Sequence, residues 1–315
     1  MAVNMSNTIV ISEFMDEPAV ERLRQVAQVD YRPELVDNPE TLCQSLSDAS
    51  ALIVRNRTQV NAELLANAPH LRVVGRLGVG LDNIDMELCA EKDIMVYPAV
   101  GANAQAVAEY VIATTFVLLR GAYMASSQVR AGNWPRPQLN HGLEVAGRTL
   151  GLVGFGGIGR LTATLASALG MKIAAYDPMI NTNSPIWAET GATPMSLDDL
   201  LQHSDVISLH TPLTKETRHL LNARRIGLMK ENAVLINTSR GGIVDEQALV
   251  AALQAGKLRG AALDVFEDEP VKADNNLPDM PNLMLTPHIA GLTEEANERV
   301  SSVIAEKVMA YLKGK

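Results

Sequence analysis

Short apolar runs rich in β-branched residues alternate with helical stretches along almost the whole chain, and no other feature constrains its fold as strongly. Continuous apolar runs are typical of strands that are covered on both faces. Such strands, separated by helices, predict doubly wound parallel sheets and therefore an α/β protein. The expected strands are TIVIS (8–12), ALIVR (51–55), LRVVGR (71–76), IMVYPA (94–99), TLGLVGF (149–155), KIAAYD (172–177), VISLH (206–210), AVLINTS (233–239) and GAALDVF (260–266).

The alternation falls into two blocks. A long helical stretch at about 104–121 and a less regular segment rich in Pro and Gly, RAGNWPRPQLNHGLEVAGR, separate them. The 315 residues also exceed the roughly 250–300 at which single hydrophobic cores stop growing, so two domains are expected. Periodicity does not show which of the two domains holds the last helix, expected at about 293–312.

Composition excludes several classes of function. The 47% of hydrophobic and 20% of charged residues are typical of a globular protein, and the formal charge of −9 opposes binding to nucleic acid or anionic lipid. Cys43 and Cys89 form no C-x-x-C pair, so we expect no disulfide framework and no metal site, which fits the cytoplasm. The longest apolar stretch, YVIATTFVLL at 110–119, is half of the about 20 residues that a membrane span needs, so no membrane association is expected.

The stretch LGLVGFGGIGRLTATLASALGMKIAAYDP carries the strongest single motif. Gly154, Gly156 and Gly159 form a G-x-G-x-x-G pattern between an expected strand and an expected helix, and Asp177 ends the next strand. This context predicts a dinucleotide site in which the pyrophosphate lies on the free N–H groups of the helix N-terminus. An acidic group at Asp177 suits the ribose hydroxyls and repels a 2′-phosphate, so NAD is favoured over NADP. The alternative is a glycine-rich turn that binds nothing.

Three later segments place polar residues where expected strands end. They are NTSRGG with Arg240, DVFEDEP with Asp264 and Glu269, and LTPHIAG with His288. Strand ends of an open parallel sheet border the ligand crevice. Taken alone, Arg240 and Glu269 are equally explained as a structural ion pair, and His288 as a residue that starts a helix.

The order of these motifs resembles the D-isomer-specific 2-hydroxyacid dehydrogenases, in the branch similar to phosphoglycerate dehydrogenase, glyoxylate/hydroxypyruvate reductase and sulfolactate dehydrogenase. The resemblance covers nearly the whole chain through GRLGVGLDNID (75–85), NAQAVAEYV (103–111), GRTLGLVGFGGIG (147–159), HTPLTKETRHLLN (210–222), NTSRGGIVDE (237–246), GAALDVFEDEP (260–270) and LTPHIAG (285–291).

The resemblance implies a catalytic set of Arg240, Glu269 and His288, and the chemistry explains these residue types. Oxidation of a 2-hydroxy acid removes the hydroxyl proton while a hydride leaves the same carbon, and an imidazole is suited to take that proton reversibly. A carboxylate at Glu269 would orient the imidazole and favour its protonated form. The planar donors of Arg240 suit an α-carboxylate.

Further positions follow from the resemblance alone. His210 is expected to be structural or next to the adenosine rather than catalytic. The expected cofactor residues are Gly154, Gly156, Gly157, Ile158, Gly159, Asp177, His210, Thr211, Pro212, Thr238, Asp264, which would hold the nicotinamide carboxamide, His288, Gly291 and Val107. The expected substrate residues are Arg55, the backbone amides of Leu77, Gly78, Val79 and Gly80, Arg240 and His288.

The two arginines near the expected substrate site and two departures from the family pattern need separate comment. Arg55 and Arg57 lie where relatives meet the distal end of the substrate, although solvated loop arginines are an equally good explanation. The chain also departs from the family pattern, with Gly157 in place of an arginine in the glycine loop and Ala106 in place of a serine. Neither change touches the expected chemistry.

The resemblance also implies a discontinuous layout. Residues 1–101 plus 291–315 would form the substrate-binding domain and 102–290 the NAD-binding domain, with the substrate in a cleft between them. The region 104–131 resembles the one through which the family forms homodimers. The expected substrate is a small anionic 2-hydroxy or 2-keto acid, first 3-sulfolactate, with 3-phosphoglycerate or glyoxylate/hydroxypyruvate as alternatives. A different class, the NAD(H)-binding corepressors, shares the fold.

Overall fold

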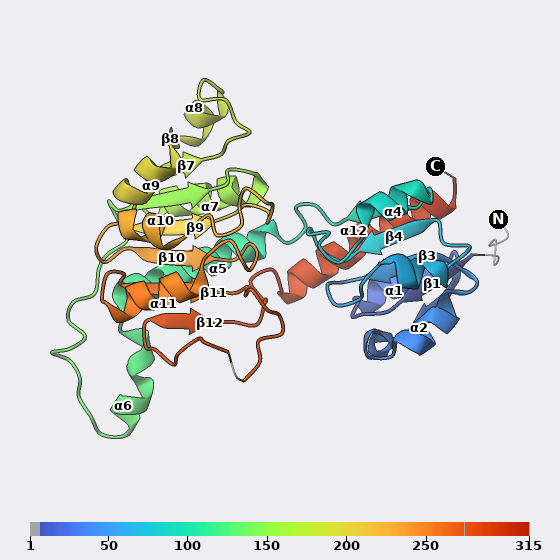
Figure 1. Cartoon of the computed structure of the whole chain (residues 1–315), viewed down its shortest axis with the longest axis horizontal. Coiled ribbons are helices and arrows are strands. Elements are labelled where there is room, and N and C mark those ends of the chain that lie inside the picture. Colours follow the sequence, from blue (N-terminus) through green and yellow to red (C-terminus); the bar gives the residue numbers. More distant parts are fainter. Residues whose placement is uncertain (1–6, 274, 315) are drawn as a thin grey trace. The chain divides into compact units, whose positions relative to one another are not determined.

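The structure is a computed structural model that describes residues 7–273 and 275–314, and the chain divides into two compact units (Figure 1). The first unit contains the residues up to Asn103 together with those from Leu292 onward. The second unit contains Ala104–Gly291. The C-terminal helix, which periodicity could not assign, therefore belongs to the first unit.

The first unit is built on a five-stranded parallel sheet in the order β2-β1-β3-β4-β5. The strands are β1 (Thr8–Ile11), β2 (Gln28–Tyr31), β3 (Ala49–Val54), β4 (Val73–Arg76) and β5 (Met95–Pro98). The helices are α1 (Glu17–Arg24), η1 (Pro33–Asp37), α2 (Pro39–Leu46), α3 (Ala62–Ala66), α4 (Met86–Glu91) and α12 (Glu294–Leu312). Strand β2 was not expected, because its sequence QVDY is half polar and it lies at the sheet edge with no fully buried residue.

The two faces of this sheet carry alternate residues of each strand. One face, with Ile9, Ile11 and Ile53, packs in a cluster with α1 and α12. The opposite face, with Val10 and Leu52, packs against α2, α3 and α4. The sheet is therefore covered on both sides, which is why its strands read as continuous apolar runs.

The second unit is built on a seven-stranded parallel sheet in the order β12-β11-β10-β9-β6-β7-β8. The strands are β6 (Thr149–Val153), β7 (Lys172–Tyr176), β8 (Thr193–Pro194), β9 (Val206–Leu209), β10 (Val234–Asn237), β11 (Gly260–Leu263) and β12 (Leu283–Leu285). The helices are α5 (Ala104–Arg120), η2 (Tyr123–Ala125), α6 (Ser126–Arg130), α7 (Gly157–Ala168), α8 (Ile186–Thr190), α9 (Leu197–His203), α10 (Ala223–Leu228) and α11 (Glu246–Gln254).

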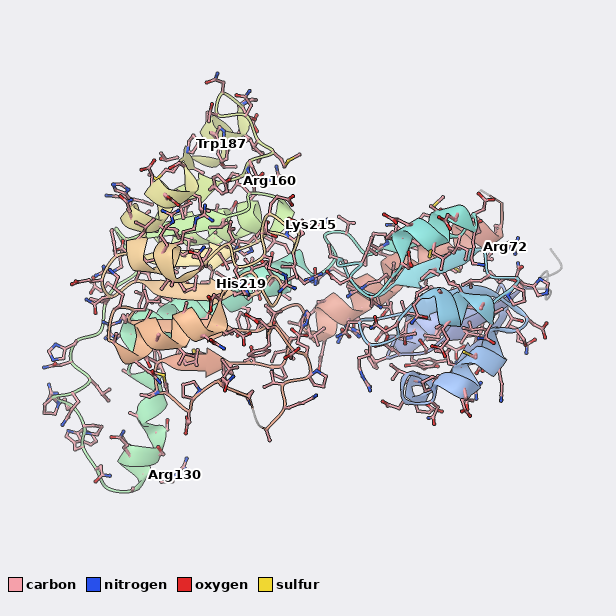
Figure 2. All side chains as sticks on the ribbon, in the orientation of Figure 1. Arg72, Arg130, Arg160, Trp187, Lys215 and His219 are labelled. Carbon is pink, nitrogen blue, oxygen red and sulfur yellow. The ribbon has the colours of Figure 1, made fainter. Side chains whose placement is uncertain are left out.

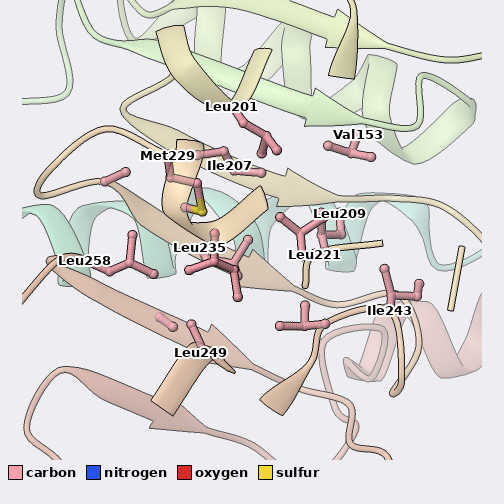
Figure 3. Close-up of a cluster of buried hydrophobic side chains, with 14 of the residues drawn as sticks. Val153, Leu201, Ile207, Leu209, Leu221, Met229, Leu235, Ile243, Leu249 and Leu258 are labelled. Carbon is pink, nitrogen blue, oxygen red and sulfur yellow. The ribbon is translucent and has the colours of Figure 1, made fainter. Parts of the chain in front are cut away.

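Both faces of this sheet are also covered. Strand residues such as Ile207, Leu209 and Leu235 gather with Leu249 of α11 and residues of α9 and α10 in one cluster (Figure 3). The other face packs against α5 and α7. The edge strands β8 and β12 are only two and three residues long, which is too short for an apolar run to reveal them.

The chain order of the strands creates a switch point in the second sheet. From β6 the chain continues through β7 and β8 on one side, whereas β9 to β12 extend on the other side. Loops that follow β6 and β9 therefore diverge, and ligands of open α/β sheets bind at the carboxyl ends beside such a point. Within the two stretches that the structure describes, no helix is long and apolar enough to cross a membrane.

Candidate active site

Most of the expected site residues follow directly on strands of the second sheet, at its carboxyl edge. Gly154 follows β6, Asp177 follows β7 and His210 follows β9. On the same edge, Thr238 and Arg240 come after β10, Asp264 and Glu269 after β11, and Thr286 and His288 after β12. Asp177 and Asp264 were expected as the last residues or interior of strands, and each lies one residue beyond its strand. Parallel strands bring these positions to one edge of one unit.

The three glycines of the G-x-G-x-x-G motif have different surroundings. Gly154 has φ +95°, and an added Cβ would lie 2.4 Å from the carbonyl oxygen of His210. At Gly159 an added Cβ would lie 2.4 Å from the carbonyl oxygen of Gly154, so the start of α7 packs closely on the loop. Added Cβ atoms at Gly156 and Gly157 would meet nothing within 4 Å. The loop is therefore open at Gly156 and Gly157 and tightly packed at Gly154 and Gly159.

The carboxylate of Asp177 holds the glycine loop from the neighbouring strand end. Its Oδ2 accepts a hydrogen bond from the Phe155 amide at 2.8 Å, and its Oδ1 accepts one from the Met179 amide at 2.9 Å. Each carboxylate oxygen retains a further acceptor position. Asp177 therefore orients the loop and keeps acceptors for hydroxyl groups of a ribose.

These residues fit a bound dinucleotide. Helix α7 begins at Gly157, and its N-cap residue Gly156 offers no side chain, so the first N–H groups have no side-chain acceptor at that position. The hydroxyl oxygen of Thr238 is buried and has no hydrogen-bond partner among the described residues. An open glycine surface, an uncapped helix N-terminus and an unpartnered hydroxyl after β10 provide the donors that a pyrophosphate and its sugar need.

His210 lies beside this loop in a neutral form. Its amide donates to Val153 O at 2.7 Å, and its Nε2 lies 3.0 Å from the hydroxyl oxygen of Ser208. Burial lowers the pKa of His210 to about 4. An imidazole that stays uncharged at neutral pH is consistent with a structural role beside Gly154. The segment after it, which carries Lys215 and His219 (Figure 2), is largely exposed.

The loops that carry Arg240 and Glu269 are packed on each other through a glycine. An added Cβ at Gly241 would lie 1.6 Å from the carbonyl oxygen of Phe266. The amide of Phe266 in turn donates to Oε1 of Glu269 at 3.0 Å. Any larger residue at Gly241 would push these loops apart, so the glycine sets the approach of the guanidinium to the carboxylate.

Glu269 and His288 form a hydrogen-bonded pair, with Nδ1 of His288 2.8 Å from Oε2 of Glu269. An ionised carboxylate only accepts, so Nδ1 carries the hydrogen and Nε2 is left to exchange a proton. Burial opposes ionisation of Glu269, but the hydrogen bonds from His288 and the Phe266 amide, with the charges of His288 and Arg240, lower its pKa below the ordinary value. The pair is therefore an ionised carboxylate that accepts one hydrogen bond from the Nδ1–H group of the imidazole.

Asp264, which was expected to hold the nicotinamide carboxamide, makes three hydrogen bonds within the protein. The residue is 1% exposed, and its two oxygens accept hydrogen bonds from the Ile289 amide, the Ala290 amide and the Thr286 hydroxyl. All three donors belong to the segment that carries His288. Asp264 thus organises this segment within the protein. Of the other expected cofactor residues, Val107 lies on helix α5, and Gly291 follows the segment that Asp264 holds.

The expected substrate loop of the first unit is available only in part. The amide of Leu77 donates to Val54 O and that of Gly78 to Arg76 O, both at 2.8 Å. Both amides therefore already have a backbone acceptor in this structure. The amides of Val79 and Gly80 make no hydrogen bond to any other described residue, so the binding of an anion would fall to these two.

The two arginines of the first unit differ in their surroundings. Arg55 donates to Oδ1 of Asn297 at 2.5 Å and lies over the ring of Phe14, and burial lowers its pKa. Arg57 pairs with Asp37 at an exposed position, which favours the alternative of a solvated loop arginine. Among the described residues Arg55 has no direct ion pair, although the nearby charge of Glu13 raises its pKa against the effect of burial.

Sequence reasoning missed several residues that shape these sites. Glu13 is buried, and its carboxylate accepts hydrogen bonds from the amides of residues 55–58, so it forms the loop that carries Arg55. Thr286 and Tyr110 bind each other beside Asp264. Thr286 and Tyr110 both lie inside recognised motifs, but the sequence does not show which residue a hydroxyl group will bind.

Comparison with known proteins places these features in a family. Residues 112–290 match the model of the D-isomer-specific 2-hydroxyacid dehydrogenase NAD-binding domain. The chain is 51% identical over 304 residues to (S)-sulfolactate dehydrogenase of Chromohalobacter salexigens, which covers 96% of this chain and 98% of the relative. It is 38% identical over 308 residues to D-3-phosphoglycerate dehydrogenase of Methanocaldococcus jannaschii, covering 97% of this chain but 57% of the length of that relative.

A solved structure agrees with the sequence comparison. The D-lactate dehydrogenase of Aquifex aeolicus, solved in complex with NAD and lactic acid, superposes with a TM-score of 0.86 at 33% identity. The match covers 98% of this chain and 96% of that one. Fold, glycine loop and relatives agree on one family.

Proposed function

Since the chain belongs to the D-isomer-specific 2-hydroxyacid dehydrogenases and is an NAD-binding enzyme of that family, we propose that it interconverts 3-sulfolactate and 3-sulfopyruvate. The observation that carries this choice is the 51% identity to (S)-sulfolactate dehydrogenase along almost the full length of both chains. The phosphoglycerate dehydrogenases reach 38%. The difference favours a sulfonate over a phosphate at carbon three.

The proposed reaction needs one proton acceptor and one hydride acceptor. When bound, NAD would supply the hydride acceptor for carbon two. In the protein, Nε2 of His288 accepts the proton of the 2-hydroxyl as that oxygen becomes a carbonyl, and it returns the proton in the reverse direction. Glu269, hydrogen-bonded to Nδ1, fixes the ring and stabilises the protonated imidazole.

Arg240 has a complementary role in this proposal. Its guanidinium presents paired donors to the α-carboxylate and draws electron density from the reacting carbonyl. Its charge also contributes to the lowered pKa of Glu269. One side chain thus binds the substrate and keeps the carboxylate partner of His288 ionised.

We assign the first unit to substrate binding and the second to NAD. The surroundings of Arg55 support the first assignment, because Asn297 and Phe14 hold the guanidinium and, among the described residues, Glu13 acts on its charge without a direct ion pair. A sulfonate carries a single negative charge over three oxygens, which suits one guanidinium.

A substrate panel tests the proposal. With NAD, the protein should oxidise 3-sulfolactate with a kcat/KM at least about ten times that for 3-phosphoglycerate, which corresponds to about 1.4 kcal/mol of discrimination. Reduction of glyoxylate and hydroxypyruvate should be slower still. Poor turnover of sulfolactate beside strong turnover of phosphoglycerate would reject the substrate. Loss of all turnover with intact NADH binding would favour the corepressor-like alternative.

A pair of arginine variants tests the distal contact. Arg55→Gln should raise KM for sulfolactate about tenfold, the loss of one charged hydrogen-bonded contact, and leave kcat/KM for glyoxylate, which has no distal group, unchanged. Arg22→Gln is the matched control, because Arg22 also binds α12, through Ser302, at the surface. An equal loss for both substrates in Arg55→Gln would contradict a distal role.

We further propose a cytoplasmic homodimer that associates through residues 104–131. Tyr123 and Val129 expose 61% and 48% of their surface on η2 and α6, and Trp134 exposes 74% on the following segment. That segment extends from the sheet of the second unit (Figure 1). Cys43 and Cys89 are free, as a reducing compartment would keep them. Light scattering on wild type and Val129→Ser would give the oligomeric state and test the surface.

A further inference from the structure

The backbone of His288 is held in a conformation that histidine rarely adopts. Its φ is +56°, in the left-handed region, where a residue other than glycine carries a cost of order 1–3 kcal/mol. Such a conformation persists only where the surrounding contacts fix it. The contacts of the Thr286–Ala290 segment therefore decide where the imidazole lies.

Asp264 holds this segment on both sides of His288. After the histidine, the Ile289 and Ala290 amides donate to Oδ1 and Oδ2 of Asp264, both at 2.8 Å. Before it, the Thr286 hydroxyl donates to Oδ1 at 2.6 Å. Thr286 is thus the only residue N-terminal to His288 within the described segment whose side chain reaches Asp264.

Tyr110 extends this contact to helix α5. Its hydroxyl oxygen lies 2.6 Å from that of Thr286. A threonine hydroxyl has one hydrogen, and here it goes to the carboxylate, which can only accept. The hydrogen between Tyr110 and Thr286 must therefore belong to Tyr110, and the chain runs in one direction from Tyr110 to Thr286 to Asp264.

Tyr110 is suited to this donor role. Burial and the charge of Asp264 raise its pKa above the ordinary value, although the hydrogen bond with Thr286 acts in the opposite direction. The phenol therefore keeps its hydrogen at every pH at which the enzyme is expected to work. Because α5 packs against β10, β11 and α7, its position is fixed independently of the His288 segment.

We propose that Thr286 and Tyr110 are positioning residues, which hold the strained segment so that the His288 imidazole keeps its place for proton transfer. The inference rests on the proposed function, in which His288 is the acid and base. Neither hydroxyl is proposed to touch the substrate or the cofactor.

Thr286→Val removes the hydroxyl with little change of volume and leaves Tyr110 without an acceptor. We expect kcat on the best substrate of the panel to fall about 10²-fold, as for a misplacement of about 1 Å, while the Kd for NADH by fluorescence stays within about twofold. Thr286→Ser restores the hydroxyl and should restore kcat. Tyr110→Phe should lower kcat about fivefold, because Thr286 keeps its own bond to Asp264.

Two further variants separate positioning from simple loss of stability. The Tyr110→Phe/Thr286→Val double variant should be no slower than Thr286→Val, since Tyr110 acts through Thr286. Thr115→Val is the matched control: its buried hydroxyl also belongs to α5, but donates to Val111 O in the same helix. This control should lower Tm without lowering kcat. Unchanged kcat in Thr286→Val with a lowered Tm, or additive losses in the double variant, would overturn the inference.

The His288→Asn background distinguishes failure of this inference from failure of the proposed function. With His288 absent, adding Thr286→Val should cause no further loss of residual turnover. If His288→Asn itself retains full turnover, the acid and base role that the proposed function gives to His288 fails. If His288→Asn is inactive while Thr286→Val alone has wild-type kcat, only the positioning role fails.

Discussion

The imidazole Nδ1 of His288 lies 2.8 Å from Oε2 of Glu269, and the contact joins the loops that follow two neighbouring strands, β11 and β12. Because the pKa of Glu269 lies below its ordinary value, the carboxylate is ionised at neutral pH and stabilises a positive imidazole. That stabilisation is present above the ordinary pKa of a glutamate and is lost as the pH falls through the lowered pKa.

Replacement of Glu269 by Gln should therefore change the pH dependence of turnover. A neutral amide stabilises imidazolium less well, so ketoacid reduction should lose rate at a lower pH in the variant than in the wild type. Steady-state rates from pH 5 to 9 measure this shift. Glu246→Gln is the control, since Glu246 accepts from the Glu267 amide without contacting His288. An unshifted profile in Glu269→Gln would contradict the pairing.

Two alanine substitutions in the glycine loop should separate protein stability from cofactor binding. Gly159→Ala places a Cβ 2.4 Å from Gly154 O, so the free energy of unfolding should fall by about 1–3 kcal/mol. Gly156→Ala meets no atom within 4 Å and keeps an ordinary φ of −74°, so stability should stay within about 0.5 kcal/mol. Its methyl group would nevertheless occupy the space expected for the pyrophosphate.

Calorimetry and NADH titration distinguish the two effects. Gly156→Ala should weaken NADH binding at least about tenfold at unchanged Tm, which corresponds to about 1.4 kcal/mol. Gly159→Ala should lower Tm even without cofactor. Wild-type NADH affinity in Gly156→Ala would mean that the open side of the loop is not where the cofactor binds.

Asp177 should determine the preference for NAD. Asp177→Ala removes the charge that repels a 2′-phosphate and the two acceptors that hold Phe155 and Met179. The ratio of kcat/KM for NADP to that for NAD should rise at least about 10²-fold, or about 2.7 kcal/mol. Asp198→Ala, an exposed carboxylate paired with Arg224, should leave the ratio unchanged. Comparable wild-type turnover with both cofactors would refute the assignment.

His210 should make the protein less stable in mild acid. Its pKa is about 4 in the folded chain against an ordinary 6.5, so the unfolded chain binds the proton more readily in between. The stability that the neutral ring contributes is present above pH 6.5 and is lost as the pH falls toward 4.

Urea unfolding at pH 7, 6 and 5 checks this dependence. The decrease in free energy of unfolding between pH 7 and 5 should be smaller in His210→Gln than in wild type. The exposed His203, whose Nδ1 lies 2.7 Å from Asp199 O, provides the control His203→Gln, whose profile should follow wild type. Parallel profiles in all three proteins would show that His210 is not the group responsible.

The architecture was predictable because a strand that is buried on both faces consists of consecutive apolar residues, which can be recognised in the sequence. Strands such as β3 and β10 are entirely buried and read as unbroken apolar runs. Strands β2, β8 and β12 were missed, since strands at or near a sheet edge that are short or half polar do not form a recognisable apolar run. The α/β class and the parallel sheets are confirmed.

The site was predictable only as a set of positions. Polar residues after parallel strands must lie along one edge, and Arg240, Glu269 and His288 do. Their partners depend on loop conformation, which sequence spacing does not specify. The bond of Asp264 to the His288 segment, and the use of the Leu77 and Gly78 amides inside the protein, are outcomes of this kind.

The role of His288 in proton transfer is tested most directly by His288→Asn. Asparagine preserves a polar side chain of similar size but cannot exchange a proton near neutral pH. The variant should lose about 10²–10⁴-fold in kcat, the contribution of a general acid or base, while its Kd for NADH and its Tm stay close to those of the wild type. Turnover of His288→Asn within a few-fold of the wild type, with NADH binding intact, would contradict the account.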